Sequence, residues 1–170
     1  GDRSLGAVVA GVDTIISAVA MAGVRNTIDQ LQQVNFPKTV TIVTATKGLD
    51  PITTNTPSKM WQASFPDHSV VVLSGPNLPA ATVVASQDIA AAERVQSIFA
   101  SDSFRIYVND DPLGTELGGT LKNITAIAAG VCDGLHLGTN AKAALLTRAL
   151  PEMIRVGTCL GAKSETFFGL

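Results

Sequence analysis

Three short polar segments follow apolar stretches of this 170-residue chain, and each could carry chemistry. The first is Ala45-Thr46-Lys47-Gly48, which comes directly after the run TVTIVT. A lysine at the end of a buried strand places an ammonium group that suits a phosphate or a carbonyl oxygen. Taken alone, Lys47 also fits the commoner description of a solvated loop lysine.

The second segment is Ser74-Gly75-Pro76-Asn77, directly after the apolar run SVVVL. Glycine lets the backbone approach a ligand closely, and an asparagine side chain offers both a hydrogen-bond donor and an acceptor. Taken alone, this segment also fits a simple turn.

The third segment is Glu116–Asn123, with the sequence ELGGTLKN. On a helix, Lys122 shares one face with small residues, namely Thr115, Gly118, Gly119, Ala126 and Ala129. Each glycine inside a helix costs about 1 kcal/mol relative to alanine, so the pair predicts that something comes close to this face. A lysine there would be partly desolvated, and its pKa should fall toward the range useful for proton transfer. The alternative is that the small residues serve helix packing and the lysine extends outward.

The elements around these segments predict an α/β domain with a largely parallel sheet. Apolar runs predict strands, and helical spacing of apolar residues predicts helices between them. In open parallel sheets, ligands bind at the carboxyl ends of strands, which is where the first two segments fall. The expected strands are 14–19, 39–44, 69–73, 81–85 and 104–108, and the expected helices are 22–34, 57–63 and 87–99.

The pattern changes at Asn109-Asp110-Asp111-Pro112, after which only helices are expected. One amphipathic stripe covers 113–131, a second helix covers 140–160, and a third begins at Ser164. Pro151 lies inside the second helix and should kink it. The sequence therefore predicts two units, 1–109 and 110–170.

Composition and single residues exclude several classes of protein. A hydrophobic fraction of 46% with 15% charged residues is unlike a disordered chain. A net charge of −2 disfavours nucleic acid as a partner, and no apolar run reaches the roughly 18 residues of a membrane span. Cys132 and Cys159 predict buried free thiols in a reducing, cytoplasmic compartment, and neither they nor His68 and His136 have metal-ligand spacing. Neither a Gly-x-Gly-x-x-Gly segment nor a Walker loop occurs in the chain.

The segments ATKGLDP, SGPN and NDDPLGTELGGTLKNITAIAAGVCDGL closely resemble the NAD(P)-dependent glycerol-3-phosphate dehydrogenase family, in particular its bacterial and cyanobacterial type. The resemblance covers essentially the whole chain. It implies a Rossmann-like dinucleotide-binding domain followed by an all-α substrate domain, with part of each present. It also implies hydride transfer between NAD or NADP and the pair glycerol 3-phosphate and dihydroxyacetone phosphate, which supplies phospholipid synthesis. A homodimer would be ordinary for the family.

The resemblance further implies roles for individual residues. Lys122 is similar to the family's general acid/base, which protonates the ketone oxygen during reduction and takes the proton back during oxidation. Lys47 is similar to a second lysine that orients substrate near the cofactor. The remaining implied substrate contacts are Gly75, Asn77 and Asn123, and the implied cofactor contacts are Val19, Met21, Gly23 and Lys47.

The chain departs from the family pattern in three places. The family begins with a strand, a Gly-rich turn and a helix that hold the pyrophosphate, and these have no match here. Its later Gly-Leu-Gly-Asp segment and the Ser-Arg-Asn segment, which grips the substrate phosphate, have no match either. Leu78 is followed at once by Pro79, where the family has a further stretch with a cofactor contact. Because a substrate dianion without its clamp loses orientation, we expect the 170 residues alone to be inactive. The alternatives are another two-domain hydroxy-acid dehydrogenase and a non-catalytic fragment or assembly module.

Overall fold

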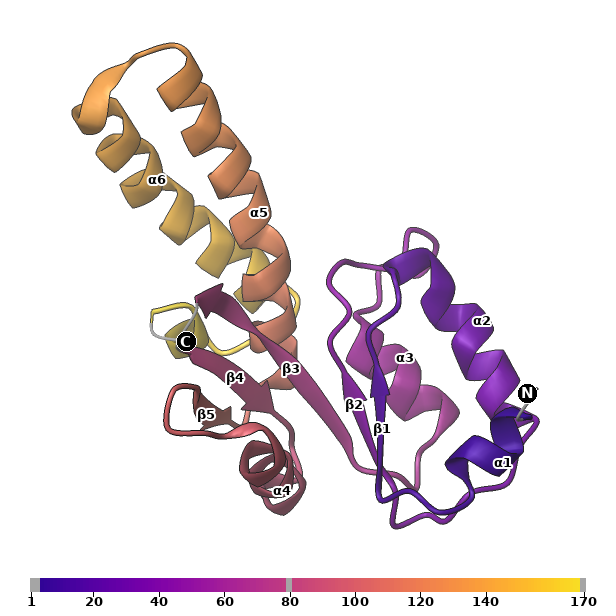
Figure 1. Cartoon of the computed structure of the whole chain (residues 1–170). Coiled ribbons are helices and arrows are strands. Elements are labelled where there is room, and N and C mark those ends of the chain that lie inside the picture. The colour runs from indigo at the N-terminus through magenta and orange to yellow at the C-terminus, as the bar shows by residue number, and fades with distance from the viewer. Residues whose placement is uncertain (1–3, 79–80, 169–170) are drawn as a thin grey trace.

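A five-stranded sheet forms the centre of the computed structural model, which describes residues 4–78 and 81–168, and for residues 75–78 the backbone alone (Figure 1). The strands β1 (Thr14–Ser17), β2 (Thr41–Thr44) and β3 (Val70–Leu78) are neighbours and run parallel to one another. The sheet continues with β4 (Ala81–Ala85) and β5 (Arg105–Asn109), which are parallel to each other.

One pairing departs from the expected parallel arrangement, because β4 runs antiparallel to β3. Only two residues of the sequence link Leu78 to Ala81, whereas a parallel crossover needs about a dozen residues or more. The carboxyl ends of β1, β2 and β3 therefore share one edge of the sheet, and those of β4 and β5 lie at the opposite edge.

Two groups of helices cover different parts of the sheet (Figure 1). Beside β1 and β2 lie α1 (Leu5–Val9), α2 (Met21–Gln32) and α3 (Pro57–Ser64), whose apolar side chains, including the fully buried Trp61, form one core cluster. A second cluster joins α4 (Ile89–Phe99) to β3, β4 and β5 through Ala91, Ala92 and Val95. The residues of α2 that enter the first cluster follow helical spacing, as expected.

After β5 the chain forms helices, and α5 (Pro112–Gly134) and α6 (Gly138–Cys159) lie side by side as an arm beyond the sheet (Figure 1). Asp111 caps α5 by accepting a hydrogen bond from the backbone N–H of Gly114, and its other carboxylate oxygen accepts from the hydroxyl of Thr166. The third helix is a single 3₁₀ turn, η1 (Ser164–Phe167), and α6 continues through Pro151. The division at Asn109 stays a prediction.

The cysteines differ from the expectation of buried thiols. Both are free, but Cys159 is exposed and Cys132 only half-buried. None of the helices in the described part of the chain combines the length and apolar character needed to cross a membrane. Within the same residues, no group of three or more His, Cys, Asp or Glu side chains could hold a metal ion.

Candidate active site

The loops that follow β1 and β2 are tied together at one edge of the sheet. The hydroxyl of Thr46 donates a 2.8 Å hydrogen bond to the backbone carbonyl oxygen of Val19. Met21, the first residue of α2, packs against Gly48, where an added Cβ would lie 3.5 Å from the Met21 side chain. Lys47 lies between these two tied residues. The segment expected to line the cofactor and the first lysine segment are therefore neighbours.

The helix α5 brings the ELGGTLKN segment to the same edge. The backbone N–H of Gly48 donates a 3.1 Å hydrogen bond to Oγ1 of Thr120, two residues before Lys122. Gly48 has a φ of +119°, a conformation that glycine adopts at little cost. The two predicted lysines thus come from different parts of the fold, and the loop after β2 that carries Lys47 contacts the helix α5 that carries Lys122 at this edge.

Lys122 has the electrostatic character that the sequence predicts. Its side chain is half-buried, and desolvation lowers its pKa below the ordinary lysine value of 10.5. The nearby positive charge of Lys47 lowers that pKa further, because a like charge disfavours the protonated form. A lysine with a lowered pKa holds a larger fraction of the neutral amine near neutral pH, as a proton-transfer group requires.

Packing explains Gly119, the second glycine of the pair in α5. A Cβ added to Gly119 would lie 2.3 Å from Oγ of Ser74, so the glycine lets α5 approach the end of β3. The close neighbour that the sequence predicts for this face is therefore a strand of the protein. The Ser74 hydroxyl is buried and has no hydrogen-bond partner among the described residues.

Glu116 is a buried residue of this region to which the sequence argument gave no role. One of its carboxylate oxygens accepts a 2.8 Å hydrogen bond from the backbone N–H of Ser58, and the other accepts from the Ser58 hydroxyl. The carboxylate thus sits at the N-terminus of α3, where the helix dipole favours negative charge. Burial nevertheless raises the pKa of Glu116, against the lowering effect of these hydrogen bonds. The sequence carries no signal for this role, because the partner Ser58 lies 58 positions away along the chain.

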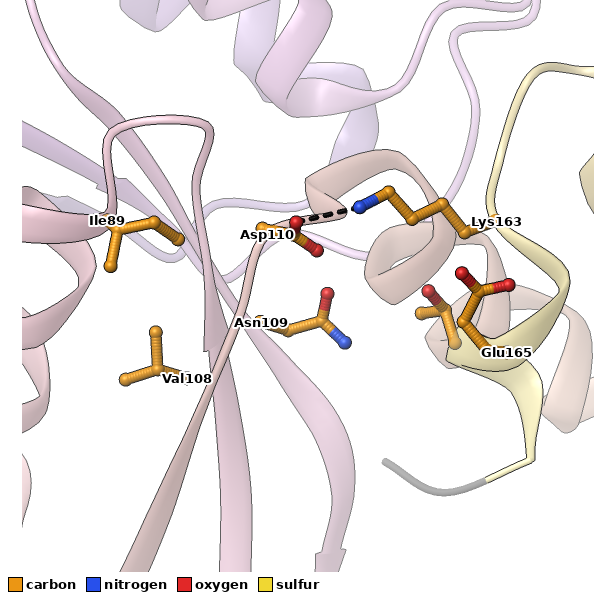
Figure 2. A pocket seen from close by; sticks show the side chains of 7 residues that line it. Ile89, Val108, Asn109, Asp110, Lys163 and Glu165 are labelled. Atoms are coloured by element: carbon orange, nitrogen blue, oxygen red, sulfur yellow. Dashed lines mark hydrogen bonds and ion pairs between the residues drawn. The ribbon is translucent and has the colours of Figure 1, made fainter.

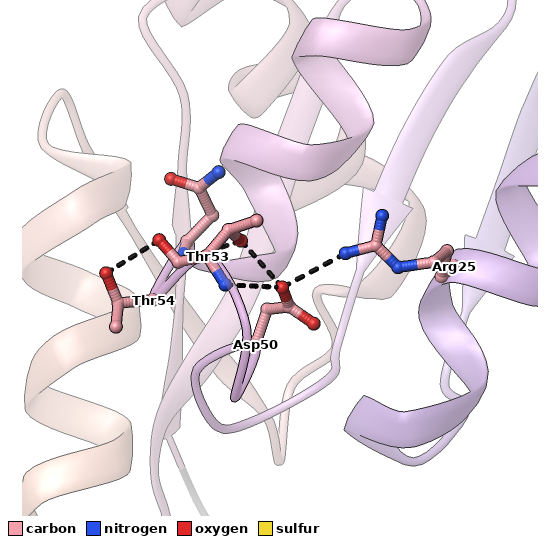
Figure 3. Close-up of polar contacts among 5 residues, drawn as sticks. Arg25, Asp50, Thr53 and Thr54 are labelled. Carbon is pink, nitrogen blue, oxygen red and sulfur yellow. Dashed lines mark hydrogen bonds and ion pairs between the residues drawn. The ribbon is translucent and has the colours of Figure 1, made fainter.

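A second polar network holds the chain after Lys47 and Gly48 (Figure 3). The buried carboxylate of Asp50 accepts hydrogen bonds from the backbone N–H and the hydroxyl of Thr53, and it pairs at 3.0 Å with the guanidinium of Arg25 on α2. The hydrogen bonds from Thr53, followed by the charge of Arg25, lower the pKa of Asp50. The loop that carries Lys47 is therefore anchored on both sides.

The remaining predicted site residues lie in different surroundings, and the structure describes them to different extents. Gly23 lies in the first turn of α2 against Val19, where an added Cβ would have ordinary contacts. The exposed Asn123 follows Lys122 on α5, and both line a groove of about 450 Å³ between α5 and α6. Gly75 and Asn77 belong to β3, where the structure describes only their backbone.

A separate pocket of about 340 Å³ lies at the opposite edge, at the carboxyl end of β5 (Figure 2). Val108 and Asn109 line it, and an ion pair between Asp110 and Lys163 crosses it. The hydrogen bond from Lys163 lowers the pKa of Asp110. None of the three predicted segments contributes to this pocket.

The comparison with protein families agrees with this geometry. Residues 2–95 match a family model described as "NAD-dependent glycerol-3-phosphate dehydrogenase N-terminus", and residues 111–170 match the model of the C-terminus. The chain belongs to this family. The resemblance of ATKGLDP, SGPN and ELGGTLKN is therefore confirmed, together with a Rossmann-like unit followed by helices.

Individual members of the glycerol-3-phosphate dehydrogenase family match along the whole chain. Proteins named glycerol-3-phosphate dehydrogenase (NAD(P)+) from Nostoc sp. and Synechocystis sp. are each 58% identical, over 178 and 176 aligned positions. These alignments cover 100% and 99% of this chain but 58% and 56% of the relatives. The crystal structure of glycerol-3-phosphate dehydrogenase from Coxiella burnetii superposes with a TM-score of 0.88 at 34% identity, covering 98% of this chain and 53% of that one.

The lengths of these alignments show that this chain is shorter than its relatives. The chain spans somewhat more than half the length of the relatives it matches. The Nostoc alignment has 178 positions although this chain has 170 residues, so at least eight positions of the relative have no counterpart here. A gap of this size is compatible with the dropped stretch that the sequence predicts after Leu78.

Proposed function

We propose that this chain contributes the acid/base centre of an NAD(P)-dependent oxidoreductase that interconverts glycerol 3-phosphate and dihydroxyacetone phosphate. The observation that carries the proposal is the hydrogen bond that joins the loop of Lys47 to the helix of Lys122 at the carboxyl edge of β1, β2 and β3, together with the pKa of Lys122, which burial and the charge of Lys47 lower. Membership of the family and the names of the relatives support this substrate pair.

The residues present fit a nicotinamide cofactor at this edge. Val19 and Met21 are half-buried and apolar, and they contact Thr46 and Gly48, the two residues that flank the ammonium-bearing Lys47. An apolar wall next to ammonium groups suits a flat ring that meets an anionic substrate. NADH or NADPH, when bound, supplies the hydride that reduces the substrate. In this proposal Val19, Met21 and Gly23 line the cofactor, and Lys47 lies between cofactor and substrate.

The chain's own groups then manage the proton and the orientation of the substrate. In the reducing direction, Nζ of protonated Lys122 donates its proton to the ketone oxygen of dihydroxyacetone phosphate as the alkoxide forms. In the oxidising direction, neutral Lys122 accepts the proton of the C2 hydroxyl. The ammonium of Lys47 orients the anionic substrate, and Gly75, Asn77 and Asn123 add contacts beside it.

We further propose, from family membership, that the protein acts as a cytoplasmic homodimer and that its product serves phospholipid synthesis. The oligomeric state is measured directly by light scattering during size-exclusion chromatography. A molar mass of a single chain at assay concentration would contradict the dimer.

The test of the activity uses the natural gene product that carries these 170 residues. Oxidation of NADH and of NADPH is followed by absorbance after addition of dihydroxyacetone phosphate, and the reverse reaction with glycerol 3-phosphate. Several 2-keto acids serve as competing substrates. We expect turnover with dihydroxyacetone phosphate and little with the keto acids. Preference for a keto acid would instead assign the chain to a hydroxy-acid dehydrogenase of the same fold.

A further inference from the structure

Lys47 lies in a turn, and the residues on either side of it, Thr46 and Gly48, each form a hydrogen bond to another part of the fold. On one side, the Thr46 hydroxyl donates to the carbonyl of Val19. On the other side, the N–H of Gly48 donates a 3.1 Å hydrogen bond to Oγ1 of Thr120, which belongs to α5. The second bond joins residues 72 positions apart in sequence, so it fixes the loop of the sheet relative to the helix that carries Lys122.

We propose that Thr120 is a positioning residue of this site, whose hydroxyl holds the Lys47–Gly48 turn against α5 and thereby sets the separation between the two lysine ammonium groups. The proposal deepens the proposed function and rests on it for its catalytic meaning. Its geometric content, the link from Thr120 to Lys122 through Lys47, can be tested without any substrate.

The physical link is the repulsion between like charges, which rises as the distance between them shortens. Lys47 is the charged residue that acts on Lys122. Two other elements pack against this part of α5. The side chains with which α6 lines the groove beside Lys122 are uncharged, namely Leu146, Ala149, Leu150 and Met153, and the nearest residue of β3 is the uncharged Ser74, which lies against Gly119. Releasing the turn would therefore weaken the repulsion by which Lys47 lowers the pKa of Lys122.

Removal of the hydroxyl has a defined direction. A valine in place of Thr120 keeps the shape of the side chain but cannot accept the hydrogen bond from Gly48. The turn then relaxes and Lys47 moves away from Lys122. The weaker repulsion stabilises the protonated form of Lys122. The pKa of Lys122 should rise toward the ordinary lysine value of 10.5, whereas Thr120→Ser, which retains the acceptor, should leave it unchanged.

The experiment is an NMR titration of ¹³C-methylated lysines in the natural gene product that carries these 170 residues, with the Lys122 signal assigned by its loss in Lys122→Met. Wild type, Thr120→Ser, Thr120→Val and the control Thr147→Val are compared. Thr147 lies on the exposed side of α6, where its hydroxyl donates to Ala143. We expect an upward shift of the Lys122 midpoint in Thr120→Val alone, with faster hydrogen exchange of the Gly48 amide. An unchanged midpoint in a folded Thr120→Val chain overturns the proposal.

A second variant decides whether the effect passes through Lys47. Lys47→Met should raise the Lys122 midpoint by itself, and adding Thr120→Val to it should produce no further rise. If Lys47→Met leaves the midpoint unchanged, or if Thr120→Val raises it equally in both backgrounds, the proposal is wrong. These readouts need no turnover. Absence of dehydrogenase activity would therefore count against the proposed function and leave this result to stand by itself.

Discussion

At the scale of single residues, Lys122 is the group on which the proposed chemistry depends. Its replacement by methionine keeps most of the length of the side chain and removes the proton it transfers. General acid/base groups contribute about 10²–10⁴-fold to rate, so Lys122→Met should lower kcat by that order in the natural gene product. Binding of NADH, measured by fluorescence titration, should change little. The matched control is Lys142→Met, since Lys142 pairs with Asp133 on the distant part of the helical arm.

The lowered pKa of Lys122 also predicts opposite pH dependence for the two directions of the reaction. Reduction needs the protonated amine, so its kcat should fall as pH rises through the Lys122 pKa. Oxidation needs the neutral amine, so its kcat should rise over the same interval. Both changes should centre below 10.5, because burial and Lys47 lower the pKa. Initial rates in both directions over a pH series measure this, and parallel rather than opposed profiles would contradict the assignment.

The residues predictable from sequence are those whose chemistry conflicts with their surroundings. Lys122 stood out because a charged side chain follows two helix glycines, and its lowered pKa agrees with that argument. Thr120 and Glu116 have roles that depend on partners far away in sequence, Gly48 and Ser58. Threonine is ordinary in a helix and a lone glutamate is ordinary on its surface. Only the tertiary contacts distinguish these two residues.

At the scale of elements, the positions of the strands and helices follow the apolar pattern of the sequence closely. The direction of one strand, β4, does not follow from that pattern. Burial on both faces matches β2, whose four residues are all β-branched and all buried, and helical spacing marks the inner face of α2. The pattern of β4 contains no information on its direction, which is decided by the short link after Leu78. Likewise, nothing in Ser164–Phe167 distinguishes one 3₁₀ turn from the start of a longer helix.

The start of α5 offers a prediction about stability. A Cβ added to Gly114 would lie 2.1 Å from Oδ2 of Asp111 and 2.9 Å from Cγ2 of Thr166, so it would disturb the network that joins α5 to η1. Gly114→Ala should lower the free energy of unfolding by about 1–3 kcal/mol, the usual cost of overpacking. Urea unfolding of the 170-residue chain measures the change.

Gly130 provides the matched control on the same helix. An added Cβ there meets nothing within 4 Å, so Gly130→Ala should raise the free energy of unfolding by about 1 kcal/mol through helix propensity alone. Equal effects of the two substitutions would show that helix propensity, rather than contact with Asp111 and Thr166, governs both sites.

At the scale of the whole molecule, the contact between α5 of the helical arm and α3 beside the sheet depends on the buried carboxyl group of Glu116. The carboxylate of Glu116, on α5, accepts two hydrogen bonds from Ser58 at the start of α3. Truncation by Glu116→Ala would leave the N–H and hydroxyl of Ser58 without their partner. That loss should lower the free energy of unfolding by about 2 kcal/mol. Glu116→Gln keeps an oxygen for the Ser58 N–H and should recover most of it.

The pH dependence of that contact has a definite sign. Burial raises the pKa of Glu116 above its ordinary value of 4.5, so the folded state binds this proton more tightly than the unfolded state does. The resulting stabilisation is fully present below that ordinary value and is lost as pH rises through the higher folded value. Glu116→Gln has no such proton. The difference in unfolding free energy, wild type minus Glu116→Gln, should therefore decrease as pH rises above 4.5, and urea unfolding of both chains over a pH series measures it. A difference that grows with pH would mean that the hydrogen bonds from Ser58 outweigh burial, and that the charged carboxylate is the form that holds α5 to α3.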